Sequence, residues 1–254
     1  MFIISMSDHN NPSKIRFPFI DWLRGFAIFL MVIYHFCYDL DMFGYIDTAF
    51  GHGYWVPFRY IIVIGFLSLV GVSLVIVHGK SIRWSSLKKR TFQLALASLA
   101  VSISSYFIAP QKVTIFGILQ FILVASWFVL PLLKRPQVSF VLGVSIFTLG
   151  HVIQSRVFES NWIHWLGMVV EKRPALDYVP IFPWLGVVLI GISLAHFFLY
   201  TSIGQKIASL DLTRLTGVGK FNLMLEKMGQ HSLVIYLVHQ PIMFAGFYFI
   251  ELLK

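Results

Sequence analysis

The stretch that decides the fold is residues 19–40, which read FIDWLRGFAIFLMVIYHFCYDL. At about 1.5 Å per residue, a helix of this length crosses the hydrocarbon core of a bilayer. Four polar side chains interrupt the apolar run, and at about 100° per residue they project within about 60° of one another. Ionisable groups are costly inside a membrane, so an aligned set predicts a functional site. The four are Asp21, Arg24, His35 and Asp39.

The whole chain has the composition of a polytopic membrane protein. Of its 254 residues, 57% are hydrophobic and only 12% are charged, whereas a soluble domain carries about twice that charged fraction. The formal net charge of +9 does not indicate nucleic-acid binding, because the basic residues lie in short clusters between apolar segments. The single cysteine, Cys37, excludes an intrachain disulfide. We predict one transmembrane domain over residues 1–254.

Seven apolar segments predict an all-α bundle of about seven transmembrane helices. Each segment is close to the roughly 20 residues that a span needs, and the third and fifth are near the short end of the range. Residues 1–18 are not expected to be a cleaved signal peptide, because no small-residue cleavage site follows the first apolar run. The segments are 19–40, 57–79, 91–109, 115–133, 137–154, 181–200 and 232–252.

The distribution of Lys and Arg predicts that the N-terminal tail, residues 1–18, is cytoplasmic. With this orientation the inner segments hold fourteen of the twenty Lys and Arg, in keeping with the positive-inside rule. Arg24 then lies near the cytoplasmic boundary, and His35 lies about 16 Å further along the helix, in the outer half of the bilayer. The six outer basic residues are Arg59, Lys112, Arg156, Lys172, Arg173 and Lys254.

Polar groups in the first and last spans are the candidates for chemistry. Asp39 lies one turn beyond His35, where it could accept a hydrogen bond from one ring nitrogen and leave the other free as a base. The last span carries His239 and Gln240 well inside the membrane. The alternative interpretation is that Asp21 and Arg24 pair only with each other and that His35 is a packing residue. We favour the functional interpretation for the aligned set.

The outer segment 155–180 combines aromatic and polar residues. Tryptophans there are typical of an interfacial belt, which is the simpler interpretation. Aromatic rings interleaved with Asn, His and Glu could also form a platform on which a sugar stacks. The residues concerned are Glu159, Trp162, His164, Trp165, Glu171, Lys172, Arg173 and Asp177.

Five short motifs follow one another along the chain. They are Asp21-Trp22-Leu23-Arg24-Gly25, then His35, then Phe116-Gly117-Ile118-Leu119, then Pro183-Trp184-Leu185-Gly186, then His231-Ser232-Leu233 through Tyr236 to His239-Gln240-Pro241. In this order they resemble the bacterial members of the heparan-α-glucosaminide N-acetyltransferase catalytic-domain family, over about residues 16 to 245. The resemblance implies a membrane acyltransferase, whose partners are acyl-CoA, a carbohydrate or glycan acceptor and the lipid bilayer.

The resemblance also implies which histidine is the base. In the wider superfamily of membrane acyltransferases that modify carbohydrates, the first helix carries an Arg, ten intervening residues and a catalytic His. Arg24 and His35 match that spacing. The lysosomal enzyme has an Asn at this helix position, and its proposed catalytic His lies in the loop that follows, where His52 is the nearest candidate here. We therefore rank His35 first and His52 second.

The implied reaction moves an acetyl group from cytoplasmic acetyl-CoA to a hydroxyl or amine outside. Arg24 and Arg90 would hold the CoA phosphates, and His35 would act as base or carry the acetyl group covalently. His239, with its neighbours in the last span, would bind the thioester carbonyl or the acceptor. The candidate substrate- and CoA-binding residues are Asp21, Arg24, Arg90, Gln120, Trp184, Tyr236 and Gln240; no metal site is predicted.

Two other functions remain open from the sequence. A proton-coupled transporter of a small anion also aligns Asp, Arg and His in its helices, although seven unequal spans do not suggest an internal repeat. Nine histidines also allow a haem-b protein. Such a site needs paired histidines at matched depth, and His35 in the outer half of the bilayer is a poor match for His239 nearer the midplane. We expect a multi-pass protein of the bacterial inner (plasma) membrane. The acceptor, the acyl chain length and the presence of a homo-oligomer are left open.

Overall fold

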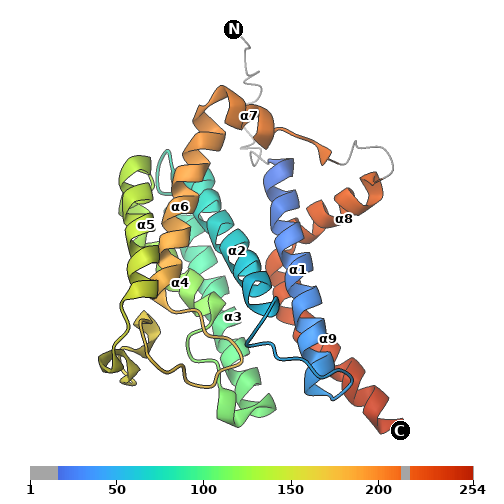
Figure 1. Ribbon diagram of the computed structural model, residues 1–254. Coiled ribbons are helices and arrows are strands. Elements are labelled where there is room, and N and C mark those ends of the chain that lie inside the picture. The colour runs from blue at the N-terminus through green and yellow to red at the C-terminus, as the bar shows by residue number, and fades with distance from the viewer. Residues whose placement is uncertain (1–16, 213–217, 254) are drawn as a thin grey trace.

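The structure is a computed structural model that describes residues 17–212 and 218–253, and within these ranges it is a bundle of helices (Figure 1). Five of them are long and apolar enough to cross a membrane, which confirms the all-α membrane fold. They are α1 (Pro18–Met42), α2 (Trp55–His78), α3 (Trp84–Ile108), α6 (Ile181–Tyr200) and α9 (Ser232–Leu252).

Two shorter apolar helices, α4 (Ile118–Phe128) and α5 (Pro136–Val152), lie beside the long ones. The predicted span 115–133 gives an α-helix of only 11 residues. It begins after Gly117 and passes into a 3-10 turn at Leu130, next to Pro131, whose missing N–H cannot continue the ladder. The count of seven spans therefore stays a prediction.

Helix α6 lies at the centre of one half of the bundle, between α2 and α5. Glycines allow these backbones to touch. A Cβ added at Gly71 would lie 2.2 Å from the Val188 carbonyl oxygen, and one at Gly191 would lie 2.2 Å from that of Ser68. The buried core beside this contact includes Leu67 and Phe121, neither of them exposed to solvent. The apolar segments thus close-pack through small residues, as membrane helices commonly do.

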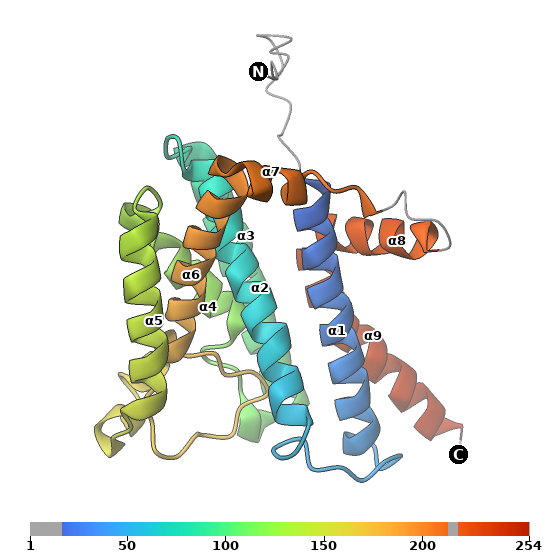
Figure 2. The ribbon, with the colours of Figure 1, turned by 45° about the horizontal axis from the view of Figure 1, so that its top comes forward.

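The other half of the bundle is built on α1, which packs against α2, α8 (Gly219–Gln230) and α9. Figure 2 shows α8 crossing α1 almost at right angles, while α7 (Ser202–Ala208) lies across the end of the bundle where α1 begins. We call this the N-terminal end. The opposite end carries the loop 43–54, the long segment 153–180 and the end of α9.

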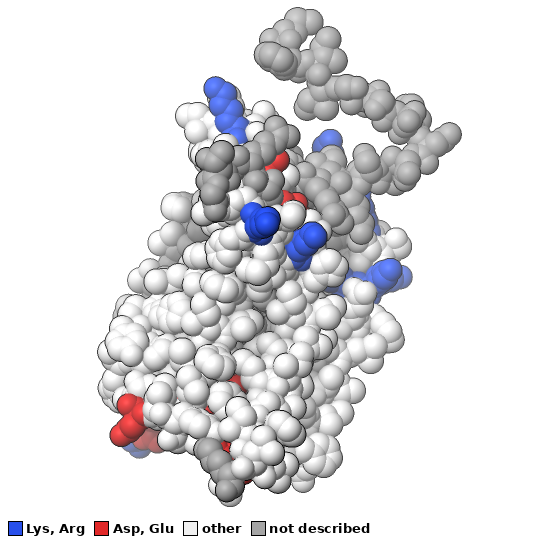
Figure 3. Space-filling model, turned by 90° about the vertical axis from the view of Figure 1, so that its right-hand side faces the viewer, with Lys and Arg blue, Asp and Glu red and all other residues white. Residues whose placement is uncertain are grey.

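The two ends differ in charge. On the face seen in Figure 3, Lys and Arg gather toward the N-terminal end, above a wide surface of uncharged side chains. This distribution is the one expected if the N-terminal end is cytoplasmic. The predicted cytoplasmic tail lies, as far as residue 16, outside the described residues, as do the basic residues Arg214 and Lys254.

Candidate functional site

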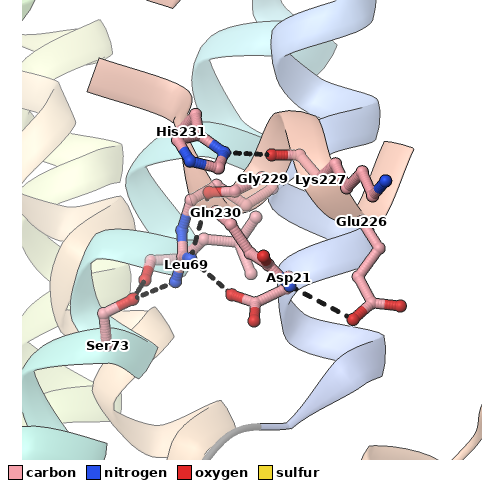
Figure 4. A network of polar contacts seen from close by, with 9 residues as sticks. Asp21, Leu69, Ser73, Glu226, Lys227, Gly229, Gln230 and His231 are labelled. Atoms are coloured by element: carbon pink, nitrogen blue, oxygen red, sulfur yellow. Dashed lines mark hydrogen bonds and ion pairs between the residues drawn. The ribbon is translucent and has the colours of Figure 1, made fainter. Parts of the chain in front are cut away.

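Arg24 is the centre of a polar network that joins α1, α2 and α8 near the N-terminal end, and Figure 4 shows its partners Asp21, Ser73 and Gly229. Its Nη1 donates to Asp21 Oδ1 at 2.8 Å, and its Nη2 donates to Ser73 Oγ on α2 at 2.9 Å. Nη1 also lies 3.5 Å from the Gly229 carbonyl oxygen on α8. The Ser73 hydroxyl in turn donates a hydrogen bond to the Leu69 carbonyl oxygen at 2.6 Å. Arg24 is therefore more than the partner of Asp21: it is held in a fixed position.

The approach of α8 to this network depends on two glycines. A Cβ at Gly25 would lie 1.7 Å from the Leu225 carbonyl oxygen, and one at Gly229 would lie 1.8 Å from that of Asp21. The two backbones are in direct contact where the helices cross. Gly25, the last residue of the first motif, thus places α8 beside Arg24.

A second arginine stands close to the first. Arg90 on α3 lies near enough to Arg24 for the two positive charges to repel each other. His78, at the end of α2, also faces Arg83 and Arg90, and its Nδ1 accepts the backbone N–H of Arg83 at 3.2 Å. This group of cations at the N-terminal end is suited to an anion that carries several negative charges, because charge-assisted hydrogen bonds are the strong ones.

The second polar cluster lies nearer the opposite end, where α1 faces α9. The rings of His35 and His239 lie 5.1 Å apart between centroids, with 61° between their planes. His239 Nδ1 is 2.7 Å from the Tyr236 carbonyl oxygen, which can only accept, so Nδ1 carries the proton and Nε2 holds a free lone pair. One turn further on, the Gln240 amide donates to Asp39 Oδ1 at 3.3 Å.

The atoms that this cluster leaves without partners are its most informative feature. Four buried polar atoms on the facing sides of α1 and α9 have no hydrogen-bond partner among the described residues: His35 Nδ1, Asp39 Oδ2, His239 Nε2 and Gln240 Oε1. Nearly all buried polar groups in proteins are paired. Four such atoms in one place, from residues that the sequence had singled out, mark this cluster as the candidate site.

The sequence predicts that Asp39 could accept a hydrogen bond from His35. Asp39 is fully buried and lies one turn from His35, but among the described residues it makes no hydrogen bond to that histidine. Gln240 reaches across from α9 to its carboxylate instead. The carboxylate therefore fixes α9 against α1, and His35 Nδ1 remains without a partner.

Asp177 extends this cluster toward the outer segment 153–180. Its Oδ2 accepts the backbone N–H of Ile118, at the start of α4, at 2.8 Å and the hydroxyl of Tyr236 at 3.3 Å. Burial raises the pKa of the Asp177 carboxyl, against the effect of these two hydrogen bonds. Sequence reasoning placed Asp177 only in an outer loop, because its partners lie 59 residues away in each direction.

A pocket of about 430 Å³ opens beside Asp177. Aromatic rings line it together with amide, cationic and carboxylate groups, and the Nε2 of His164 is buried there without a partner. Since Asp177 touches Tyr236, whose ring lies 5.7 Å from that of His239, one side chain separates the pocket from the histidine pair. The polar and aromatic lining residues are Phe116, Asn161, His164, Trp165, Arg173, Asp177 and Tyr178.

Three other predicted residues lie outside both clusters. Gln120 donates to the Ser98 carbonyl and the Ser102 hydroxyl on α3, and so joins α3 to α4. Trp184 is only 9% exposed, and its ring packs 5.2 Å from that of Tyr60 on α2. His52 is exposed on the loop between α1 and α2. Among the described residues, no group of three or more His, Cys, Asp or Glu could hold a metal ion.

Comparison with known proteins identifies the family. Residues 16–241 match the family described as heparan-alpha-glucosaminide N-acetyltransferase, catalytic. The matched residues include α1, both polar clusters and the outer pocket. No curated protein and no solved structure gave a match. Membership implies acetyltransferase activity in a membrane. The chain therefore belongs to the heparan-α-glucosaminide N-acetyltransferase catalytic-domain family.

Proposed function

We propose that this protein transfers an acetyl group from acetyl-CoA, bound at the N-terminal end, to a sugar or glycan acceptor bound at the opposite end. The observation that carries the proposal is the pair His35 and His239 where α1 faces α9. Each ring buries one nitrogen, His35 Nδ1 and His239 Nε2, that has no hydrogen-bond partner among the described residues. Free lone pairs shielded from water are what a base needs to take a proton from an acceptor hydroxyl or amine.

The donor side rests on Arg24 and Arg90. These cations would bind the phosphates of CoA, and the Asp21 and Ser73 hydrogen bonds hold the Arg24 guanidinium in place before the donor arrives. Along α1, Arg24 and His35 are separated by about 16 Å. The flexible arm of CoA would cover this distance and carry the thioester to the histidine pair.

At the histidine pair the acceptor oxygen or nitrogen attacks the thioester carbonyl, its proton passes to His35 or His239, and the CoA thiolate leaves and takes up a proton. In the covalent variant, His35 attacks the thioester carbonyl first and the CoA thiolate leaves. The acceptor then attacks the acetyl carbonyl and loses its proton, and the imidazole of His35 is released. Gln240 Oε1 and Asp39 Oδ2 are also buried without a hydrogen-bond partner among the described residues. They are suited to accept hydrogen bonds from the acceptor.

The pocket beside Asp177 is our candidate for the acceptor. Trp165 and Phe116 offer ring faces, while Asn161 and Arg173 offer hydrogen-bond donors, a combination that suits a carbohydrate. Arg173 already donates to Asn161 Oδ1 and to the Glu159 carbonyl, which fixes its direction. We place the protein in a bacterial inner membrane with its N-terminus in the cytoplasm, so that this pocket faces envelope glycans.

The test is acetyl transfer from radiolabelled acetyl-CoA to a panel of sugars and amino sugars, with the purified protein in lipid nanodiscs. His35→Ala and His239→Ala should lower transfer by about 10²- to 10⁴-fold, while His52→Ala, at the second-ranked candidate base, should retain it. Label that stays on the wild-type protein in the absence of acceptor, and is lost in His35→Ala, would support the acyl-histidine. Full transfer by a folded His35→Ala protein would overturn the proposal, and a visible absorption spectrum of the same preparation tests for haem.

A further inference from the structure

Helix α8 has two faces of different character. The face toward α1 is buried through Asn222, Leu225 and Gly229, and Asn222 accepts the indole N–H of Trp22 at 3.0 Å. At about 100° per residue, Lys220, Leu223, Met224 and Lys227 project from the opposite side. All four are exposed.

This outer face and the elbow between α8 and α9 form an open groove of about 400 Å³. Its floor is apolar, and its two lysines are seven residues apart, so they stand on the same side about 10 Å from each other. No acidic residue lines the groove. The nearest acid along α8, Glu226, accepts a hydrogen bond from Gln230 at 3.2 Å (Figure 4). The lining residues are Lys220, Leu223, Met224, Lys227, Met228, His231 and Ile235.

We propose that this groove binds an anionic phospholipid, with the phosphate at Lys220 and Lys227 and an acyl chain along the apolar floor. Exposed apolar side chains on a helix of a membrane protein are expected to meet lipid. Lysine stems lie along apolar surface while their ammonium groups reach for phosphate. Basic residues at the cytoplasmic surface attract anionic lipids in this way. The charge and the apolar floor together match a lipid better than a soluble anion.

A lipid bound to the outer face of α8 would affect the Arg24 network, because the opposite face of α8 contacts that network. The Gly229 carbonyl lies 3.5 Å from Arg24 Nη1, and the Leu225 carbonyl fills the space beside Gly25. A lipid that holds α8 against α1 therefore also holds Arg24 in its binding position. This second step rests on the proposed acetyl transfer, whereas lipid binding itself does not.

The experiment compares nanodiscs of phosphatidylcholine alone with discs that also contain phosphatidylglycerol. We expect the anionic lipid to raise the Tm of the full chain and to remain bound in native mass spectrometry. Each lysine replaced in Lys220→Gln and Lys227→Gln should weaken this binding about fivefold. The control Lys88→Gln/Lys89→Gln removes two exposed lysines from α3 at the same end and should leave it unchanged. An equal loss in the control, or no loss in the double variant Lys220→Gln/Lys227→Gln, would overturn the proposal.

Two further measurements separate the alternatives. In the first, CoA is added to the wild type and to the double variant. If CoA displaces phosphatidylglycerol from the wild type, and the double variant no longer binds CoA in neutral discs, the groove is the CoA site and the lipid proposal is wrong. For the coupling, we expect the KM for acetyl-CoA to rise in neutral discs with little change in kcat; an equal KM in both discs contradicts it. Specific lipid binding without acetyl transfer in any disc would refute the proposed function and leave the lipid site standing.

Discussion

The two polar clusters on α1 lie about 16 Å apart on one helix face, yet they are built differently. Arg24 finds partners on its own helix and on α2 and α8, so its position is set by the fold. In the cluster of His35 and His239, four buried polar atoms have no hydrogen-bond partner within the part of the chain that the structure describes. The contrast fits the proposed function. The preformed site would bind the phosphates of the acetyl donor, and the hydrogen bonds of the incomplete site would be completed by the reacting groups.

The largest expected effect is on activity, at the incomplete site. Replacing His35 by Ala removes a base and should lower kcat by about 10²- to 10⁴-fold. The Tm should change little, because the Nδ1 of His35 has no hydrogen bond to lose. Acetyl transfer and thermal unfolding of the same preparation measure both. A large drop in Tm with unchanged kcat per folded molecule would instead make His35 a packing residue.

The next effect is on stability, at the preformed site. Gly25→Ala would put a methyl group 1.7 Å from the Leu225 carbonyl oxygen, so α8 must move away at a cost of about 1–3 kcal/mol or more. The matched control is Gly65→Ala on α2, where an added Cβ meets nothing within 4 Å. We expect a lower Tm and a higher KM for acetyl-CoA in the first variant only. Equal Tm values in the two variants would mean that α8 does not pack on α1 as described.

The two clusters on α1 could be predicted from the sequence in part, because helical periodicity shows which residues lie on the same face of a helix. It aligned Arg24 with His35, but it placed His239 nearer the midplane than His35, whereas the structure brings the two rings to 5.1 Å from each other. It could not predict α8, whose mixed polar and apolar composition reads as a loop between spans. Gly229 lies inside α8 and packs on the backbone of Asp21. The pairing of Gly25 with Gly229 is a tertiary contact that no local pattern reveals.

A smaller effect is expected from the hydroxyl that supports Arg24. Ser73→Ala removes one of the hydrogen bonds of the guanidinium and should cost about 1 kcal/mol. Because Asp21 still holds Nη1, we expect the KM for acetyl-CoA to rise a few-fold while kcat stays close to that of the wild type. Ser104→Ala, an exposed serine on α3, is the control. A fall in kcat alone would contradict a role in donor binding.

The smallest effect concerns pH and the carboxyl of Asp177, which joins the outer pocket to Tyr236. Burial raises its pKa in the folded protein above the usual value of about 3.9. The folded state then binds more protons than the unfolded state between these two pKa values. The stability that the Asp177 carboxyl contributes is therefore fully present below its pKa in the unfolded state. It is lost as the pH rises through its pKa in the folded state.

Asp177→Asn isolates this contribution, because a single oxygen, Oδ2, accepts both the Ile118 N–H and the Tyr236 hydroxyl. The amide oxygen of Asn can take its place and keep both hydrogen bonds without a charge. We expect the Tm of the variant, relative to the wild type, to increase as the pH rises from about 4 toward 7. Asp47→Asn, at an exposed position on the loop after α1, should show no such trend. If the Tm of Asp177→Asn and that of the wild type change with pH in parallel, the Asp177 carboxylate is solvated. Water would then reach the place where Asp177 and Tyr236 separate the pocket from the histidine pair.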